Sequence, residues 1–139
     1  MQPSKEQPLG SCPTAGILIV DDAAEWRLRV REILETRPEL QIVGEAGDGL
    51  QGIQRAVELN PDLVLIDIGM PILNGIEAAK QILRTAPRSK IVFLTQERDC
   101  DIRGAALDVG AVGYVLKANA ATELIPSIVA VLRNGHRAS

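Results

Sequence analysis

The stretch from Asp62 to Pro71 reads DLVLIDIGMP. Its four consecutive apolar residues, Leu63 to Ile66, are too few for a helix and predict a short strand buried on both faces. The strand ends at the carboxylate of Asp67, and burying an ion is costly unless polar partners compensate for it. Asp67 could therefore cap a helix or point into a polar site at the edge of a sheet, and this stretch alone leaves both interpretations open.

The composition is that of one ordinary globular domain. The chain has 139 residues, of which 46% are hydrophobic, 24% charged and only 2% aromatic, so the core must be mainly aliphatic. A formal net charge of −3 gives no indication of a nucleic-acid surface. Cys12 and Cys100 lack CxxC spacing, and no apolar run approaches the roughly 18 residues of a membrane span. We expect a cytoplasmic protein that contacts neither nucleic acid nor membrane directly.

Three segments are expected along the chain. Residues 1–15 contain three prolines among polar residues and predict a disordered tail. Residues 16–134 form the predicted domain. Residues 135–139 are expected to begin a linker or C-terminal tail, because Asn134-Gly135 is a typical helix-ending signal.

Short apolar runs alternate with helical patterns throughout the predicted domain. Strands are predicted at residues 17–20, 41–46, 63–66, 90–95 and 111–116. Helices are predicted from Ala24 to Pro38, Gly49 to Leu59, Asn74 to Pro87, Asp99 to Val109 and Ala120 to Arg133.

Helical spacing also predicts which side chains face inward. One face of the first helix carries Trp26, Val30, Ile33 and Leu34, and Glu25 can pair with Arg29 one turn later. The inward residues predicted for the second helix, with Asp48 as its N-cap, are Leu50, Ile53 and Val57.

Five strands alternating with five helices predict an α/β fold with a parallel sheet covered on both faces. Right-handed crossovers favour a doubly wound five-stranded parallel sheet in the order 2-1-3-4-5, which is flavodoxin-like.

This strand order brings several polar residues to one edge of the sheet. The order reverses between strands one and three, which end at Asp21-Asp22 and at Asp67. Thr95 at the end of strand four and Lys117 after strand five lie at the same edge.

The chemistry of this group indicates phosphoryl transfer. Converging carboxylates repel one another unless a cation lies among them, and Mg²⁺ prefers oxygen ligands with room for water. A lysine and a threonine hydroxyl can both bind phosphoryl oxygens. The carboxylates, a bound divalent metal, the lysine and the hydroxyl together are suited to phosphorylation of Asp67 itself.

Four motifs resemble the receiver domain of bacterial two-component response regulators. They are VDD at 20–22, DxxMPxxNG at 67–75, Thr95, and GYVLK at 113–117, and the resemblance covers residues 16–134. It implies that Asp67 accepts a phosphoryl group from a sensor histidine kinase.

The resemblance also assigns a metal site and a switch. It implies that Mg²⁺, with Mn²⁺ as a substitute, is bound by Asp22, Asp67, the backbone carbonyl of Gly69 and, through water, Asp21. The residues implied to bind the phosphoryl group or to move with it are Lys117, Thr95 and Tyr114. Those implied to tune its lifetime are Gly69 and Glu97.

The GYVLKA and ELIPSI segments resemble the NarL/FixJ subfamily, whose members usually carry a C-terminal LuxR-type helix-turn-helix. We therefore expect control of transcription through a DNA-binding domain beyond Ser139, or alternatively a stand-alone receiver that docks onto other proteins. A homodimer could form through the strand 4–helix 4–strand 5 face or through the terminal helices.

Two positions differ from the common receiver pattern. Gln96 replaces a small residue, which leaves open a receiver that is never phosphorylated, and Ala118 replaces the proline associated with a cis peptide.

A haloacid-dehalogenase-type phosphatase also uses a nucleophilic aspartate, but it needs an acid at the position of Gly69. Self-phosphorylation and self-dephosphorylation are the only chemistry we expect, so the chain is not predicted to be an enzyme.

Overall fold

The computed structural model describes residues 14–138. The predicted N-terminal tail lies outside the described residues except for its last two positions, and Ala15 already belongs to the first strand.

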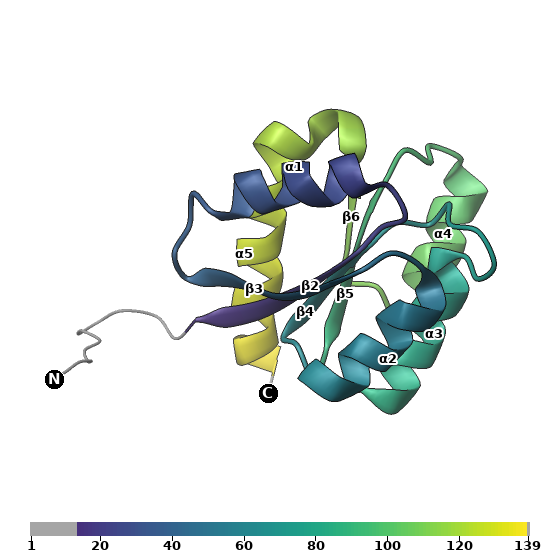
Figure 1. Ribbon diagram of the computed structural model, residues 1–139, viewed down its shortest axis with the longest axis horizontal. Helices are drawn as coiled ribbons and strands as arrows, with labels where there is room; N and C mark the ends of the chain where they lie inside the picture. Colours follow the sequence, from purple (N-terminus) through teal and green to yellow (C-terminus); the bar gives the residue numbers. More distant parts are fainter. Residues whose placement is uncertain (1–13, 139) are drawn as a thin grey trace, which may run out of the picture.

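Parallel strands form the centre of the domain (Figure 1). The strands are β2 (Ala15–Val20), β3 (Leu40–Ala46), β4 (Leu63–Ile66), β5 (Lys90–Thr95) and β6 (Gly113–Leu116). They pair in the order β3-β2-β4-β5-β6, which confirms the predicted topology 2-1-3-4-5.

Helices cover both faces of this sheet. The helices are α1 (Ala24–Leu34), α2 (Gly49–Leu59), α3 (Gly75–Thr85), α4 (Cys100–Asp108) and α5 (Ala120–Ala138), with a 3-10 turn η1 at Lys117–Asn119. In Figure 1, α1 and α5 lie on one side of the sheet and α2, α3 and α4 on the other.

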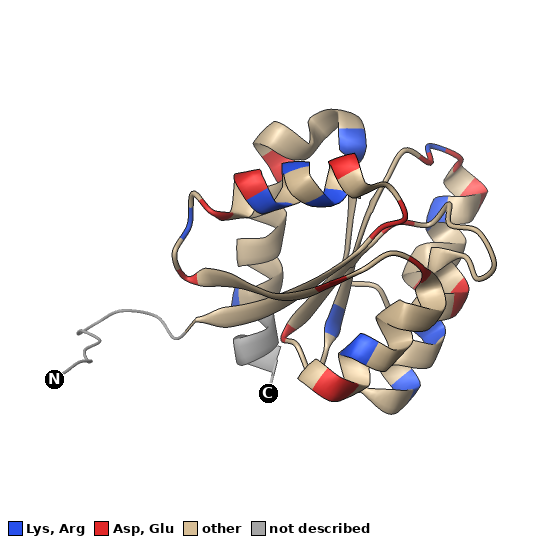
Figure 2. Ribbon diagram, viewed as in Figure 1, with Lys and Arg blue, Asp and Glu red and all other residues tan. Residues whose placement is uncertain are grey.

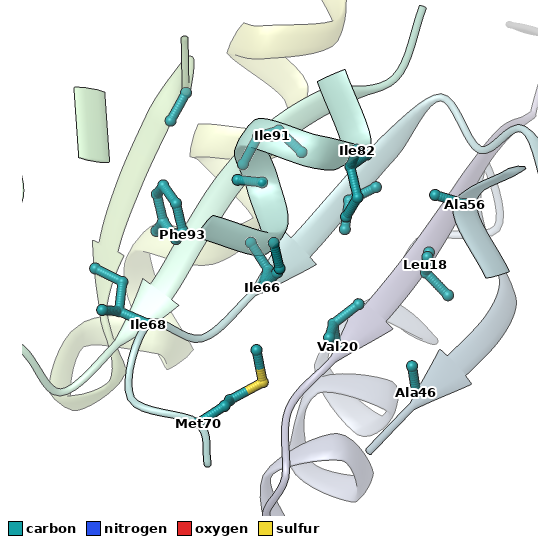
Figure 3. Packing of buried hydrophobic residues seen from close by; sticks show 14 of the residues in the cluster. Leu18, Val20, Ala46, Ala56, Ile66, Ile68, Met70, Ile82, Ile91 and Phe93 are labelled. Carbon is teal, nitrogen blue, oxygen red and sulfur yellow. The ribbon is translucent and has the colours of Figure 1, made fainter. Parts of the chain in front are cut away.

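Alternate residues of each strand enter two separate aliphatic cores. Leu18 and Val20 pack with Ile66 and Phe93 beneath α2 and α3 (Figure 3), whereas Ile19 packs beneath α1 and α5. This division explains the uninterrupted apolar run of β4, because in a doubly covered sheet every strand residue faces a core.

The predicted inward face of α2 is wrong at two positions. Leu50 and Val57 are 53% and 54% exposed, and the buried residues of α2 are Gly49, Gly52 and Ala56. A Cβ atom on Gly52 would lie 2.9 Å from Val20 Cγ1, so α2 approaches the sheet too closely for large side chains. Only Ile53 of the predicted residues packs against the core.

Other helix details also differ from the sequence-based expectations. The final helix continues through Gly135 to Ala138, where a linker was expected, since one glycine costs a helix only about 1 kcal/mol and does not by itself end it. The Arg29 guanidinium lies 5.5 Å from the centre of the Trp26 ring, rather than pairing with Glu25. Asp48 caps α2 as predicted, accepting a hydrogen bond from the Gln51 amide.

Charged residues are mixed over the surface (Figure 2). Lysine and arginine are spread over separate helices among acidic residues, and further acidic residues lie in the loops. No helix in the described part of the chain is long and apolar enough to cross a membrane.

Ile72, in the loop between β4 and α3, is held in a strained conformation. Its φ angle is 69° and its side chain is 84% exposed, and a β-branched residue is disfavoured at positive φ. Glycine carries no such penalty, although its greater freedom in the unfolded chain offsets part of the gain. We expect Ile72→Gly to raise the free energy of unfolding by about 0.5–1 kcal/mol in urea titrations.

Val112→Gly is a matched control, because Val112 is also exposed but its φ is not positive. This change is expected to lower stability by about 0.5–1 kcal/mol. If both variants lost the same amount of unfolding free energy, the strain at Ile72 would be contradicted.

Candidate functional site

The carboxyl ends of β2 and β4 lie side by side and place the acidic residues together. Val20 pairs with Ile66 at the ends of these strands, and the Asp67 amide donates to the Val20 carbonyl at 3.1 Å. Asp21 and Asp67 are therefore the first residues beyond two hydrogen-bonded neighbouring strands, at the point where the strand order reverses.

Three carboxylates converge at this edge. Asp21, Asp22 and Asp67 each offer an oxygen, and these oxygens all lie within 4.8 Å of one another. Asp21 and Asp67 are only 4% and 8% exposed, whereas Asp22 is exposed. Oxygen donors that are partly buried and open to water on one side fit a Mg²⁺ ion, which keeps several of its own waters.

Asp21 is fixed by local hydrogen bonds. Its Oδ1 accepts from the Ala23 amide at 2.9 Å, and its backbone carbonyl accepts from the Arg27 guanidinium at 2.5 Å. Burial raises the pKa of the Asp21 carboxyl, although hydrogen bonds from Lys117 and Ala23 oppose this, while the charge of Asp67 adds to it. Asp21 therefore shapes the start of α1 and faces the site as well.

Lys117 supplies the positive charge among these acids. Its Nζ lies 2.8 Å from Asp21 Oδ2 and 3.2 Å from Asp67 Oδ2. The residue follows β6 directly and is only 6% exposed. The ammonium thus bridges the two buried carboxylates.

Trp26 belongs to the site although the sequence predicted it only as part of an apolar helix face. Lys117 Nζ lies over the indole ring, 4.9 Å from its centre. A cavity of about 250 Å³ opens beside this pair, lined by Trp26, Gln96, Arg98, Leu116, Lys117 and Ala118. One sequence feature could have placed Trp26 at the site: it lies in the first turn of the helix that follows Asp21-Asp22 at the sheet edge.

Thr95 and Tyr114 both contact the backbone of Glu97, in the loop after β5. The buried Thr95 hydroxyl accepts from the Glu97 amide at 3.2 Å, and the Tyr114 hydroxyl donates to the Glu97 carbonyl at 2.8 Å. Burial and the nearby charge of Glu97 raise the pKa of the half-buried Tyr114. These two side chains therefore hold one loop in place, beside the acidic cluster.

The remaining predicted positions flank the opening of the site. Gly69 is exposed, and a Cβ atom there would meet no atom within 4 Å. Gln96 is exposed at the edge of the cavity, so its side chain is directed to solvent at least in part. No cis peptide bond occurs in residues 14–138, which agrees with an alanine after Lys117.

The loop after β4 folds back tightly onto Asp67. The Gly75 amide donates to the Ile68 carbonyl at 2.8 Å. Met70, which lies within this loop, is buried in the core. A Cβ atom on Gly75 would lie only 1.9 Å from the Asp67 carbonyl oxygen. Glycine is therefore required where α3 begins.

A doubly wound sheet with an acidic triad and a buried lysine at its reversal point is the arrangement of a known family. Residues 17–129 match the response regulator receiver domain. The chain belongs to this family, and it is a receiver domain of two-component response regulators.

Individual relatives agree with this assignment. Transcriptional regulatory protein LiaR of Bacillus subtilis (strain 168) is 40% identical over 112 residues, which are 81% of this chain and 53% of LiaR. Protein CcdB of the same organism is 38% identical over 120 residues, which are 86% of this chain and 98% of CcdB.

Similarity extends to solved structures of the LuxR family. The crystal structure of a LuxR-family two-component response regulator from Aurantimonas sp. SI85-9A1 superposes with a TM-score of 0.83 at 33% identity, covering 87% of this chain and 86% of that one. The chain spans about half the length of LiaR.

Proposed function

We propose that Asp67 is the phosphoryl acceptor of this receiver domain and that a sensor histidine kinase supplies the phosphoryl group in a Mg²⁺-dependent reaction. The observation that carries the proposal is the convergence of Asp21, Asp22 and Asp67 within 4.8 Å, with Lys117 bonded to two of them. Of the two acids that contact the lysine, Asp67 is the one that follows the central strand β4.

In the reaction, a carboxylate oxygen of Asp67 attacks phosphorus. The P–O bond to Asp67 forms as the P–N bond to the kinase histidine breaks, and the electron pair leaves with the imidazole, which takes up a proton. Lys117 bears the positive charge that binds the transferred phosphoryl oxygens. Mg²⁺ would neutralise charge on the carboxylates and the phosphoryl group, and its proposed ligands are Asp22, Asp67, the Gly69 carbonyl and, through water, Asp21. Mn²⁺ is expected to substitute.

Phosphorylation would then change the loop after β5. A new dianion at Asp67 attracts the Thr95 hydroxyl, which at present accepts from the Glu97 amide. Tyr114 would rotate inward as its bond to the Glu97 carbonyl is released. The altered surface would be the one formed by β5, α4 and β6, with Gly69 and Glu97 tuning how long the phosphoryl group survives.

Transcriptional control through a DNA-binding domain outside this chain is our preferred output. It is supported by the similarity to LiaR, a transcriptional regulatory protein. A stand-alone receiver acting by protein docking is the second candidate, supported by the 98% coverage of Protein CcdB. In both cases we propose a cytoplasmic signalling switch and not a turnover enzyme. A homodimer could form through the β5–α4–β6 face or through the terminal helices.

Mass spectrometry can test Asp67 as the acceptor. Incubation with acetyl phosphate and Mg²⁺ is expected to add one acid-labile phosphoryl group to the peptide containing Asp67, and EDTA or Asp67→Asn should abolish the addition. Asp108→Asn, which changes an exposed carboxylate on α4, should leave it intact. A mass gain that survives Asp67→Asn would refute the proposal, and sustained hydrolysis of p-nitrophenyl phosphate would favour a phosphatase instead.

A further inference from the structure

The ammonium of Lys117 has an aromatic neighbour as well as two acidic ones. An ammonium has three N–H donors, and the oxygens of Asp21 and Asp67 lie 2.8 and 3.2 Å from Nζ. The Trp26 ring faces the same Nζ, with its centre 4.9 Å away. This distance is within the range of a cation–π interaction, which is stronger when the cation is shielded from water, as Lys117 is.

The indole ring is itself held in place by α1. Trp26 packs against the core formed with Val30 and Leu34, two buried residues of the same helix. Arg27, next to it, bonds both to the Asp21 carbonyl and to Glu45 on β3. The ring, Asp21 and Asp22 are therefore carried by one anchored segment.

The two kinds of neighbour respond differently to the chemistry proposed at Asp67. A cation that binds the carboxylates of Asp21 and Asp67 offsets their negative charge, so their attraction for the ammonium weakens before the phosphoryl group arrives. An aromatic ring keeps its attraction because it neither titrates nor binds the metal. Without the ring, the cavity of about 250 Å³ beside Lys117 would give the side chain room to swing away.

We propose that Trp26 is a positioning residue that holds the Lys117 ammonium beside Asp67 through the face of its indole ring. Its effect on phosphorylation rests on the function proposed above, whereas the contact between ring and ammonium does not. The ring acts on the reaction only through Lys117.

Two variants separate the aromatic face from simple packing. Trp26→Leu keeps an apolar side chain but removes the ring face, and it is expected to slow phosphorylation by acetyl phosphate about five-fold. Trp26→Phe retains a ring and should recover most of the rate. Arg29→Gln removes the exposed cation near the same ring and should leave the rate unchanged.

A measurement without metal or phosphoryl donor tests the contact itself. In proton NMR spectra of the unmodified protein, the Lys117 Hε resonances should be shifted upfield by the ring current of Trp26. The shift should persist in Trp26→Phe and vanish in Trp26→Leu, while circular dichroism shows that both variants are folded.

The outcomes distinguish this inference from the proposed function. A missing upfield shift, or equal phosphorylation rates in Trp26→Leu and the unmodified protein, would overturn the role of Trp26. If the unmodified protein shows the shift but takes up no phosphoryl group, the function proposed for Asp67 fails, and with it the catalytic consequence of the contact.

Discussion

Replacing Gly75 with alanine is expected to lower the free energy of unfolding by about 3 kcal/mol or more. The added Cβ would lie 1.9 Å from the Asp67 carbonyl oxygen, 2.7 Å from its carbonyl carbon and 2.8 Å from the Ile68 Cα. All three atoms belong to the backbone, so no side chain can rotate aside. The Gly75 amide is also bonded to the Ile68 carbonyl, and the loop cannot move outward without breaking that bond. Urea unfolding monitored by circular dichroism would measure the loss.

Gly104→Ala is the matched control for this change. Gly104 lies inside α4, and a Cβ atom there would meet nothing within 4 Å. Alanine is preferred to glycine within a helix by about 1 kcal/mol, so the same substitution should be stabilising there. If Gly75→Ala stayed within about 1 kcal/mol of the unmodified protein, the close approach of α3 to Asp67 would be disproved.

Lys117→Met is expected to destabilise the metal-free protein by about 3 kcal/mol, because removing one partner of a buried ion pair leaves the others uncompensated. Asp21 and Asp67 would then face each other without the ammonium that now lies 2.8 and 3.2 Å from their oxygens. Lys80→Met is the control, since Lys80 is exposed on α3 and its loss should change stability by less than about 0.5 kcal/mol.

Mg²⁺ should restore more stability to Lys117→Met than it adds to the unmodified protein. A ligand that binds the folded state stabilises it in proportion to the logarithm of its concentration over its dissociation constant. The ammonium competes for the oxygens of Asp21 and Asp67, so its removal should tighten metal binding. Thermal unfolding across a Mg²⁺ titration would show this, and equal stabilisation of both proteins would mean that lysine and metal do not share these oxygens.

The sequence was sufficient to predict the sheet and the gathering of polar residues at its edge. In a doubly wound fold, strand order follows from the alternation of strands and helices, and parallel strands bring all their carboxyl ends to one side. The positions of Asp21, Asp67, Thr95 and Lys117 therefore depend only on which residue ends or follows each strand.

Features that depend on close packing could not be predicted from the pattern of strands and helices. Helical spacing favours large apolar residues as the inward face, but α2 lies so near Val20 that glycine and alanine take that place, and Leu50 and Val57 are turned outward. The contact of Trp26 with Lys117 joins residues that are 91 positions apart in the sequence. Periodicity cannot show which way an indole at the margin of a helix face will turn.

The hydrogen bond from Tyr114 to the Glu97 carbonyl also affects the basal signalling level of the unphosphorylated domain. A neutral hydrogen bond contributes about 1 kcal/mol net, which corresponds to a ratio of roughly five between two conformers that differ only in that bond. We therefore expect a noticeable minority of unphosphorylated molecules to have the tyrosine released at any moment. Such a domain would respond in a graded manner from a measurable basal level, and Tyr114→Phe would raise that level.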